Sequence, residues 1–239
     1  MRMHTDRVVL ITGATGGLGP YVVRAFAQEG ARLSPAGRKL EEAEAVIREV
    51  GLSDDRALPF AVDVTNAEGV KAWVGAVQQK WGRADVLVNI AGGYKPGKPV
   101  HELEDADWDF MLNLNARSAL NTCRAVVPLM LAQGSGKIVN VGAKQALAAG
   151  RKSTAYAVSK AAVLRLTEAL SAEVRDQGVN VNAVIPSTID TPANRAGQPD
   201  ADYSKWVAPE DLAAVILFLA SDAAIAIHGA AIPVYGKGG

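Results

Sequence analysis

Cysteine is almost absent from the sequence, and neither sign of charge is in excess. The single cysteine, Cys123, cannot form a disulfide within the chain, so the usual sequence sign of secretion is missing. Lysine and arginine number 25 and so do aspartate and glutamate, which gives a formal net charge of zero. Without a basic excess there is no electrostatic case for nucleic acid or an anionic membrane as a partner.

Long hydrophobic runs are also missing. The apolar run at residues 8–11 is too short for the core of a signal peptide, and the run at 212–220 is too short to span a bilayer. The three histidines, at positions 4, 101 and 228, fit no metal-ligand spacing, so we expect no catalytic metal. We expect a cytoplasmic protein that acts on a small molecule.

Short β-rich runs alternate with longer helical runs along the whole chain. The pattern predicts strands at residues 7–12, 32–35, 57–62, 86–90, 137–141, 180–185 and 231–234, and helices at 19–28, 40–50, 67–81, 105–133, 154–176 and 209–221. Several strands are apolar on both faces, as in a parallel sheet covered by helices. We therefore predict an α/β protein in which residues 1–239 form one Rossmann-like domain, a doubly wound parallel sheet with helices on both faces.

A glycine-rich turn follows the first strand and leads directly into a helix. Its sequence, TGATGGLG, has the spacing G-x-x-x-G-x-G, which allows a tight turn and a close approach of the backbone to a pyrophosphate. An ordinary glycine-rich turn is the alternative, but the flanking strand and helix favour a dinucleotide site. The expected cofactor contacts are Gly13, Thr15, Gly16, Gly17 and Leu18.

Residues at the ends of the third and fourth strands are the next candidates for cofactor contacts. Asp63 and Val64 are placed to contact the adenine, although Asp63 at a strand end could equally cap a helix. Asn89, Ala91 and Gly92 follow the fourth strand, where small residues would let the adenosine ribose lie against the backbone.

The end of the second strand distinguishes the two dinucleotides. An acidic residue there would bind the ribose 2′-hydroxyl and repel a 2′-phosphate. The sequence has Ala36-Gly37-Arg38-Lys39 instead, with no acid. Arg38 is placed to bind the 2′-phosphate, so NADP(H) is the preferred cofactor and NAD(H) the alternative. If Arg38 is only a surface residue at a helix entry, the choice between the two stays open.

Tyr156 and Lys160 are one turn apart on one predicted helix face. An ammonium beside a phenol, aided by the positive nicotinamide ring of an oxidised cofactor, lowers the phenol pKa toward neutrality. The phenol could then exchange a proton with a substrate beside the hydride. A lone Y-x-x-x-K is a weak signal, but the glycine turn and Asn115 on the preceding long helix make chance a poor explanation.

At this point the chain resembles the short-chain dehydrogenase/reductase family over nearly its whole length. The resemblance is carried by TGATGGLG, by NIAG in place of NNAG, by Asn115, by YAVSK and by IPSTIDT. It implies that Asn115 kinks its helix and holds a water that relays protons to Lys160. It also implies cofactor contacts from Pro186, Thr188, Ile189 and Thr191, the last to the nicotinamide carboxamide, and a homodimer or homotetramer.

One departure from the family matters for the chemistry. The position of the family's catalytic serine is occupied by Ala143, which has no hydroxyl to polarise a substrate carbonyl. Loss of one such donor typically costs about 3 kcal/mol, or roughly 10²–10³ in rate. Three interpretations compete: an impaired enzyme, a dinucleotide-binding sensor without turnover, and an enzyme whose substrate needs no such donor.

A second departure favours the third interpretation. The substrate lid, about residues 187–207, is short for the family, a feature shared by its dihydropteridine reductase branch, which Gly142–Leu147 and residues 190–206 also resemble. The resemblance implies a quinonoid dihydropteridine as the hydride acceptor, with Tyr94, Ala143 and Lys144 at the substrate. Tyr94 would stack on the flat ring, unless it is simply an exposed loop aromatic. The alternative is a carbonyl or alcohol oxidoreductase, of ketone or 3-oxoacyl type, with another donor such as Ser153 or Thr154.

Overall fold

A seven-stranded parallel sheet forms the centre of the protein. The computed structural model describes residues 3–238, and the sheet order is β3-β2-β1-β4-β5-β6-β7 with every neighbouring pair parallel. The strands are β1 (Val8–Thr12), β2 (Arg32–Gly37), β3 (Phe60–Ala61), β4 (Val86–Asn89), β5 (Gly136–Val141), β6 (Val179–Pro186) and β7 (Ala231–Val234). This confirms the predicted single-domain Rossmann-like fold.

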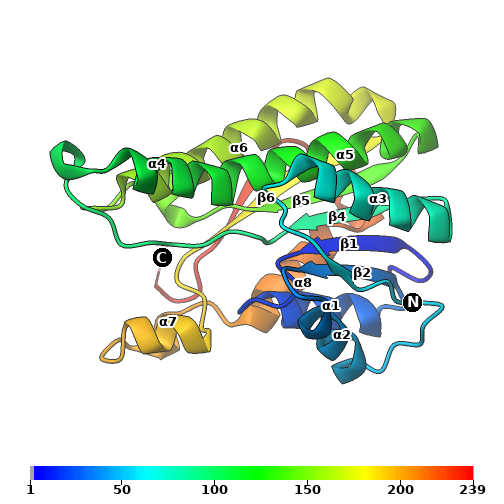
Figure 1. Ribbon diagram of the computed structural model, residues 1–239, viewed down its shortest axis with the longest axis horizontal. Coiled ribbons are helices and arrows are strands. Elements are labelled where there is room, and N and C mark those ends of the chain that lie inside the picture. Colours follow the sequence, from blue (N-terminus) through cyan, green and yellow to red (C-terminus); the bar gives the residue numbers. More distant parts are fainter. Residues whose placement is uncertain (1–2, 239) are drawn as a thin grey trace.

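Helices cover both faces of the sheet (Figure 1). One layer contains α1 (Gly19–Gln28), α2 (Leu40–Glu49) and α8 (Pro209–Leu219); the other contains α3 (Ala67–Trp81), α4 (Asp105–Met111), α5 (Ser118–Gln133) and α6 (Thr154–Val174). A short helix, α7 (Pro192–Gly197), lies apart from both layers.

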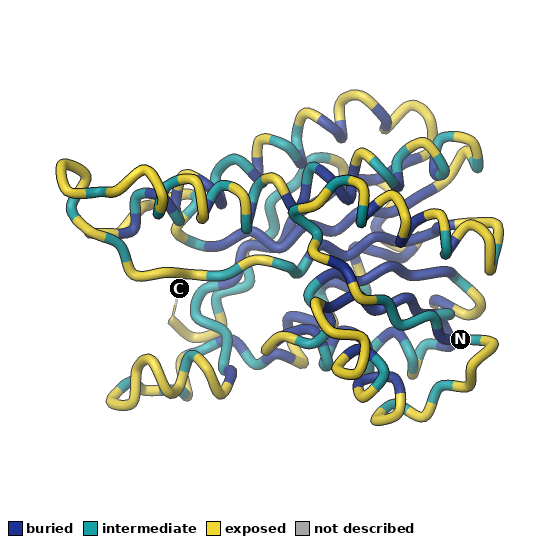
Figure 2. Tube along the Cα trace, viewed as in Figure 1, coloured by how far each residue is buried: buried dark blue, intermediate teal, exposed yellow. Residues whose placement is uncertain are grey.

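Alternate side chains of β1 point into the two layers of the core. Val9 and Ile11 belong to the apolar cluster with α1 and α8, whereas Val8 and Leu10 belong to the cluster with α3, α5 and α6. Figure 2 shows the strands buried and the outer surfaces of the helices exposed. A strand that is apolar at every position is therefore explained by burial on both faces.

Two elements differ from the sequence prediction. The third strand is limited to Phe60–Ala61, with Ala57 in an isolated bridge, because Pro59 has no N–H to donate to the ladder. The predicted helix 105–133 is divided into α4 and α5 by a π-helical turn, Leu112–Arg117, which contains Asn115. A π-helical turn is a frequent device for placing a functional side chain within a helix.

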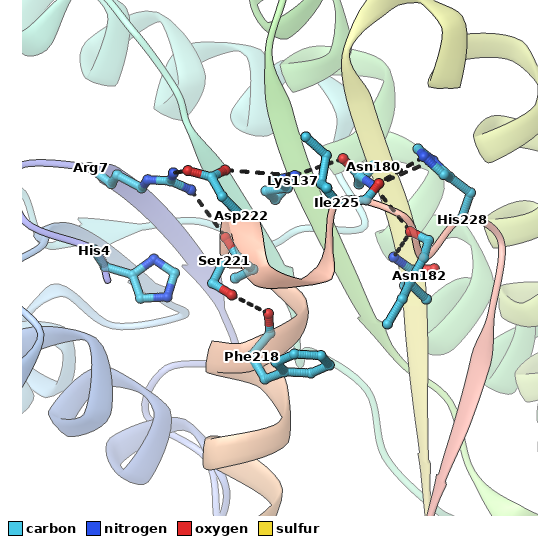
Figure 3. A network of polar contacts seen from close by, with 12 residues as sticks. His4, Arg7, Lys137, Asn180, Asn182, Phe218, Ser221, Asp222, Ile225 and His228 are labelled. Atoms are coloured by element: carbon cyan, nitrogen blue, oxygen red, sulfur yellow. Dashed lines mark hydrogen bonds and ion pairs between the residues drawn. The ribbon is translucent and has the colours of Figure 1, made fainter. Parts of the chain in front are cut away.

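A polar network closes the sheet at the amino ends of its strands (Figure 3). Arg7 pairs with Asp222, and the Lys137 ammonium donates to Asn180 Oδ1 at 2.7 Å. Asn180 Nδ2 in turn donates to the carbonyl of Ile225 at 2.8 Å. These contacts fasten the turn after α8 to β1, β5 and β6.

The opposite edge, where the strands end, is left to the loops that carry the predicted site residues. In sheets of this kind, ligands bind beyond the carboxyl ends of the strands. Across residues 3–238 no helix is both long enough and apolar enough to cross a membrane.

Candidate active site at the carboxyl ends of the strands

Neighbouring backbone atoms require glycine at two positions of the turn after β1. Gly13 has a φ of +63°, and a Cβ added there would lie 2.8 Å from the backbone nitrogen of Ala91. A Cβ added at Gly19 would lie 2.4 Å from the Ala14 carbonyl oxygen. The turn is therefore packed tightly against the loop after β4 and against its own backbone.

The side chain of Thr12 ties this turn to the end of β4. Its Oγ1 accepts hydrogen bonds from the N–H groups of Ile90 at 3.1 Å and Ala91 at 3.0 Å. The predicted contacts Ala91 and Gly92 are thus held beside the glycine turn. Together they form a backbone-lined edge that leads to the amino end of α1.

The glycine turn also contacts the segment that follows β6. A Cβ added at Gly17 would lie 2.9 Å from Thr191 Cγ2, so only a glycine fits opposite this threonine. Thr191 is buried, and its Oγ1 accepts a hydrogen bond from the N–H of Asn194. This hydrogen bond caps the amino end of α7. The structure therefore brings together predicted cofactor residues that are far apart in the sequence. The others in this region are Pro186 at the end of β6, and Thr188 and Ile189 in the loop that follows.

At the end of β2, Gly37 faces the side chain of Thr15. A Cβ added at Gly37 would lie 2.8 Å from Thr15 Cγ2, so an acidic side chain cannot be placed there without moving Thr15. Arg38 follows and is exposed. Asp63 accepts hydrogen bonds from the hydroxyl and the N–H of Thr65, which lower its pKa, and the charge of Arg38 adds a smaller effect. Val64, the next residue, is half-buried.

The side chain of Asn89 belongs to a buried amide network rather than to an open surface. Asn89 Nδ2 donates to Asn140 Oδ1 at 2.8 Å, and Thr122 donates to Asn89 Oδ1 at 2.7 Å. Asn140 Nδ2 donates to Thr167 at 2.9 Å, so the network joins β4 and β5 to α5 and α6. Only the backbone of Asn89 is left for a cofactor. The sequence analysis missed Asn140, although it occupies the same position in β5 as Asn89 does in β4.

Tyr156 and Lys160 lie on α6, as predicted. Lys160 is buried, and its ammonium donates to the carbonyl of Val141 at 2.8 Å. Burial lowers the pKa of Lys160 to about 8. Burial, with a smaller effect from Tyr94, raises the pKa of Tyr156 to about 12, which is opposite to the expected direction. In the protein alone, desolvation of the phenolate therefore sets the direction of the shift in the Tyr156 pKa.

Asn115 is a buried residue that clamps the loop after β4. Its Oδ1 accepts from the N–H of Gly93 at 3.0 Å, and its Nδ2 donates to the Gly93 carbonyl at 3.1 Å. Nδ2 also donates to Ser159 Oγ at 3.0 Å, and Ser159 donates to the carbonyl of Tyr156 at 2.7 Å. Ser159, which the sequence analysis did not select, thus links the π-helical turn to the helix of Tyr156. The predicted water relay from Asn115 to Lys160 stays a prediction.

Gly92 separates Asn115 from Lys160. A Cβ added there would lie 2.5 Å from Asn115 Oδ1 and 3.1 Å from Lys160 Nζ. The absence of a side chain at this position allows the loop, the π-helical turn and α6 to meet.

Of the predicted substrate residues, Tyr94 contacts Tyr156 directly. The ring of Tyr94 meets that of Tyr156 edge to face, with centroids 5.1 Å apart, and 56% of Tyr94 is exposed. Ala143 is buried just beyond the end of β5. Ser153 does not replace the missing hydroxyl in this conformation, because its Oγ donates to the carbonyl of Gly150 at 2.8 Å. Lys144 extends toward the carboxyl-terminal residues, with Nζ 5.0 Å from the ring centre of Tyr235.

Cys123 and the histidines contribute nothing to this site. Cys123 is buried beside Asn89, and burial raises the pKa of its thiol to about 12, so it packs as an apolar residue. No cluster of three or more potential metal-ligating side chains occurs in the described part of the chain.

Comparisons with known proteins agree with this geometry. The family model described as short chain dehydrogenase matches residues 7–202. The chain is 34% identical over 244 residues to the 3-oxoacyl-(acyl-carrier-protein) reductase of Thermotoga maritima, covering 99% of this chain and 98% of that protein. It is 35% identical over 239 residues to the D-threitol dehydrogenase of Mycolicibacterium smegmatis, covering 96% and 92%.

Solved structures give the same result. The crystal structure of levodione reductase superposes with a TM-score of 0.91 at 30% identity, over 98% of this chain and 97% of that one. That similarity extends from the glycine turn through the Tyr156 region to the last strand. The chain therefore belongs to the short-chain dehydrogenase family and is an oxidoreductase that depends on a nicotinamide dinucleotide.

Proposed function

We propose that the protein reduces a flat conjugated imine, such as a quinonoid dihydropteridine, with Tyr156 as the proton donor. The observation that carries this proposal is the buried methyl group of Ala143, where a carbonyl substrate would need a hydroxyl. A quinonoid dihydropteridine is electron-poor and accepts a hydride without that donor. Tyr94, exposed beside Tyr156, is placed to stack on a flat ring.

The residues present fit a dinucleotide. The backbone of Gly16 is open, since an added Cβ would meet only the Gly13 carbonyl at 3.4 Å. The first turn of α1 carries no acidic residue, so the positive end of its dipole is available to attract a pyrophosphate. A bound dinucleotide would supply the hydride to the electron-poor end of the conjugated acceptor.

The protein's own residues bind the cofactor and manage the proton. Tyr156 gives the phenolic proton to the acceptor nitrogen, and Lys160 stabilises the phenolate that remains. The buried ammonium is already fixed on the Val141 carbonyl, so little reorganisation is needed at the moment of transfer. The hydrogen bond from Asn115 to Ser159 holds the π-helical turn in register with α6, which carries both groups.

For the cofactor we propose NADPH in preference to NADH. Gly37 cannot be replaced by an acid without displacing Thr15, and Arg38 is exposed next to it. The test is kcat/KM with each reduced dinucleotide. Arg38→Ala should lower kcat/KM for NADPH at least tenfold and leave kcat/KM for NADH nearly unchanged. A tenfold loss corresponds to about 1.4 kcal/mol. Equal losses for both would contradict the assignment.

A carbonyl or alcohol oxidoreductase is the second candidate, favoured by the names of the relatives. Two of them are named for oxo substrates and one for a polyol. In this case Ala143→Ser would restore a donor worth about 3 kcal/mol and raise ketone reduction roughly 10²–10³-fold. A sensor without turnover is disfavoured, because binding alone does not require Tyr156, Lys160 and Asn115.

The deciding experiment compares acceptors in wild type and in Ala143→Ser. NADPH oxidation should be fast with a quinonoid dihydropteridine generated in the assay, slow with ketones, and changed little for the pteridine by Ala143→Ser. Fast ketone reduction by the wild type, without pteridine turnover, would reject the pteridine assignment. We further propose a cytoplasmic location and a homodimer or homotetramer by analogy with the family.

A further inference from the structure

The loop between β5 and α6 carries positive charge without negative charge. Residues 142–153 include Lys144, Arg151 and Lys152 but no aspartate or glutamate. In the loop after β4, by contrast, the lysines are neutralised, since Lys95 pairs with Asp107 and Lys98 with Glu104. Within residues 3–238 none of the three cations of the loop after β5 takes part in an ion pair. This side of the site therefore has an unbalanced positive charge.

Lys144 is the cation of this loop next to the site. It follows Ala143 directly and is half-buried. Its Nζ lies 5.0 Å from the centre of the Tyr235 ring and 3.4 Å from the carbonyl oxygen of Gly238. The side chain thus extends over the carboxyl-terminal residues instead of into open solvent.

Those residues in turn contact the lid segment. The N–H of Lys237 donates to the Lys205 carbonyl at 3.2 Å, and a Cβ added at Gly236 would lie 2.8 Å from the Trp206 carbonyl oxygen. In Figure 1 this end of the chain lies between α7 and the loop that leads from β4 to α4. The ammonium of Lys144 therefore contacts the carboxyl-terminal residues, which in turn contact the lid.

Among the described residues, no carboxylate of the lid pairs with Lys144. Asp190 forms two hydrogen bonds with Arg195, at 2.6 and 2.7 Å, and Asp202 pairs with Lys205 at 3.5 Å. Asp200 is exposed on the lid and pairs with no described residue. Among residues 3–238 the Lys144 ammonium, which has three N–H donors, makes one hydrogen bond, the long one to the Gly238 carbonyl, so donors are left for a stronger partner.

We propose that Lys144 binds a carboxylate or phosphate group carried by the substrate, away from the bond that is reduced. The inference rests on the proposed function, because it takes the Tyr94–Tyr156 side as the substrate side. A flat acceptor with an anionic substituent would place its ring against Tyr94 and its charge on Lys144. The long bond to Gly238 would then be exchanged for a charge-assisted hydrogen bond.

The test measures binding and needs no turnover. Dissociation constants are measured on the full chain with oxidised NADP for three flat probes of similar shape: 1-naphthoate, 1-naphthyl phosphate and neutral 1-naphthamide. At least one anion should bind about five- to tenfold more tightly than the amide at low salt, and this advantage should shrink at high salt. The anion that is favoured distinguishes a carboxylate substrate from a phosphate one.

Three variants assign the effect to one residue. Lys144→Met should abolish the advantage of the anion, and Lys144→Arg should retain most of it. Lys71→Met, which removes a lysine of α3 that pairs with Glu68 outside the site, should leave it unchanged. An unchanged affinity for NADP shows that each variant is folded.

Equal binding of anions and amide by the wild type, or an unchanged ratio in Lys144→Met, would overturn the role of Lys144. Failure of the proposed function would give a different result. The wild type would then not bind NADP, or would not oxidise NADPH with any acceptor.

Discussion

Burial of the Lys160 ammonium has a measurable effect on stability. Its pKa is lowered to about 8 in the folded protein, below the ordinary lysine value, so between about pH 8 and 10.5 the unfolded chain binds more protons than the folded one. Stability of the cofactor-free protein should therefore rise with pH across this window. Below pH 8 the full cost, about 3 kcal/mol, is present.

Lys160→Met should remove this pH dependence. Urea unfolding of both proteins at pH 7.5 and pH 10 should show the variant gaining relative stability at the lower pH, while its activity is lost. If the free energy of unfolding changed equally with pH in the two proteins, the ammonium would not be desolvated.

The sequence predicted where these side chains lie in the fold, but not their electrostatics. Tyr156 and Lys160 are identified by their spacing, which a helix fixes. The direction of the Tyr156 pKa depends on how far the phenol is buried and on what the ammonium already contacts. Both are tertiary facts: Lys160 is held by the Val141 carbonyl of a different element.

At the scale of elements, the loop after β4 and the π-helical turn meet at Gly92. A Cβ there would lie 2.5 Å from Asn115 Oδ1, too close for any real contact. Gly92→Ala should therefore displace the clamp on Gly93 and move Lys160. We predict a fall in kcat/KM of about tenfold or more, or at least roughly 1.4 kcal/mol.

Gly75→Ala is the matched control for that substitution. Gly75 lies inside α3 with nothing within 4 Å of an added Cβ. Alanine there should stabilise the protein by about 0.5–1 kcal/mol and leave activity unchanged. If Gly92→Ala behaved like Gly75→Ala in both assays, the loop would not position the site.

Element order was predictable, whereas element boundaries depended on single residues. Alternating β and α patterns with two-faced apolar strands predict the sheet, but Pro59 shortens β3 and the π-helical turn divides helix 105–133. The pairing of Asn89 with Asn140 could not be predicted locally, because it requires the register between β4 and β5. The signal was an asparagine at the end of each of two neighbouring strand patterns.

At the scale of the whole molecule, His4 fastens the start of the chain to both α1 and α8. Its ring meets Phe26 edge to face, its Nε2 lies 3.1 Å from the Leu217 carbonyl oxygen, and Nδ1 has no partner among the described residues. Burial lowers its pKa below the ordinary histidine value, partly offset by the bond to Leu217. A proton on Nδ1 would have no acceptor.

The protein should therefore lose stability as the pH falls below about 6.5, where the unfolded chain takes up the proton first. His4→Gln should weaken this dependence, measured by urea unfolding at pH 7.5 and pH 5.5. The exposed His101→Gln is the control and should behave like the wild type. If His4→Gln and the wild type lost equal stability between pH 7.5 and pH 5.5, groups other than His4 would be responsible for the acid sensitivity.

The central claim is that Tyr156 protonates the acceptor beside a bound dinucleotide. Its most direct test is the rate of NADPH oxidation by Tyr156→Phe with the best acceptor, together with the dissociation constant of NADPH. We expect a rate lower by about 10²-fold or more, with cofactor affinity nearly unchanged. Full activity in Tyr156→Phe, with NADPH bound as in the wild type, would contradict it.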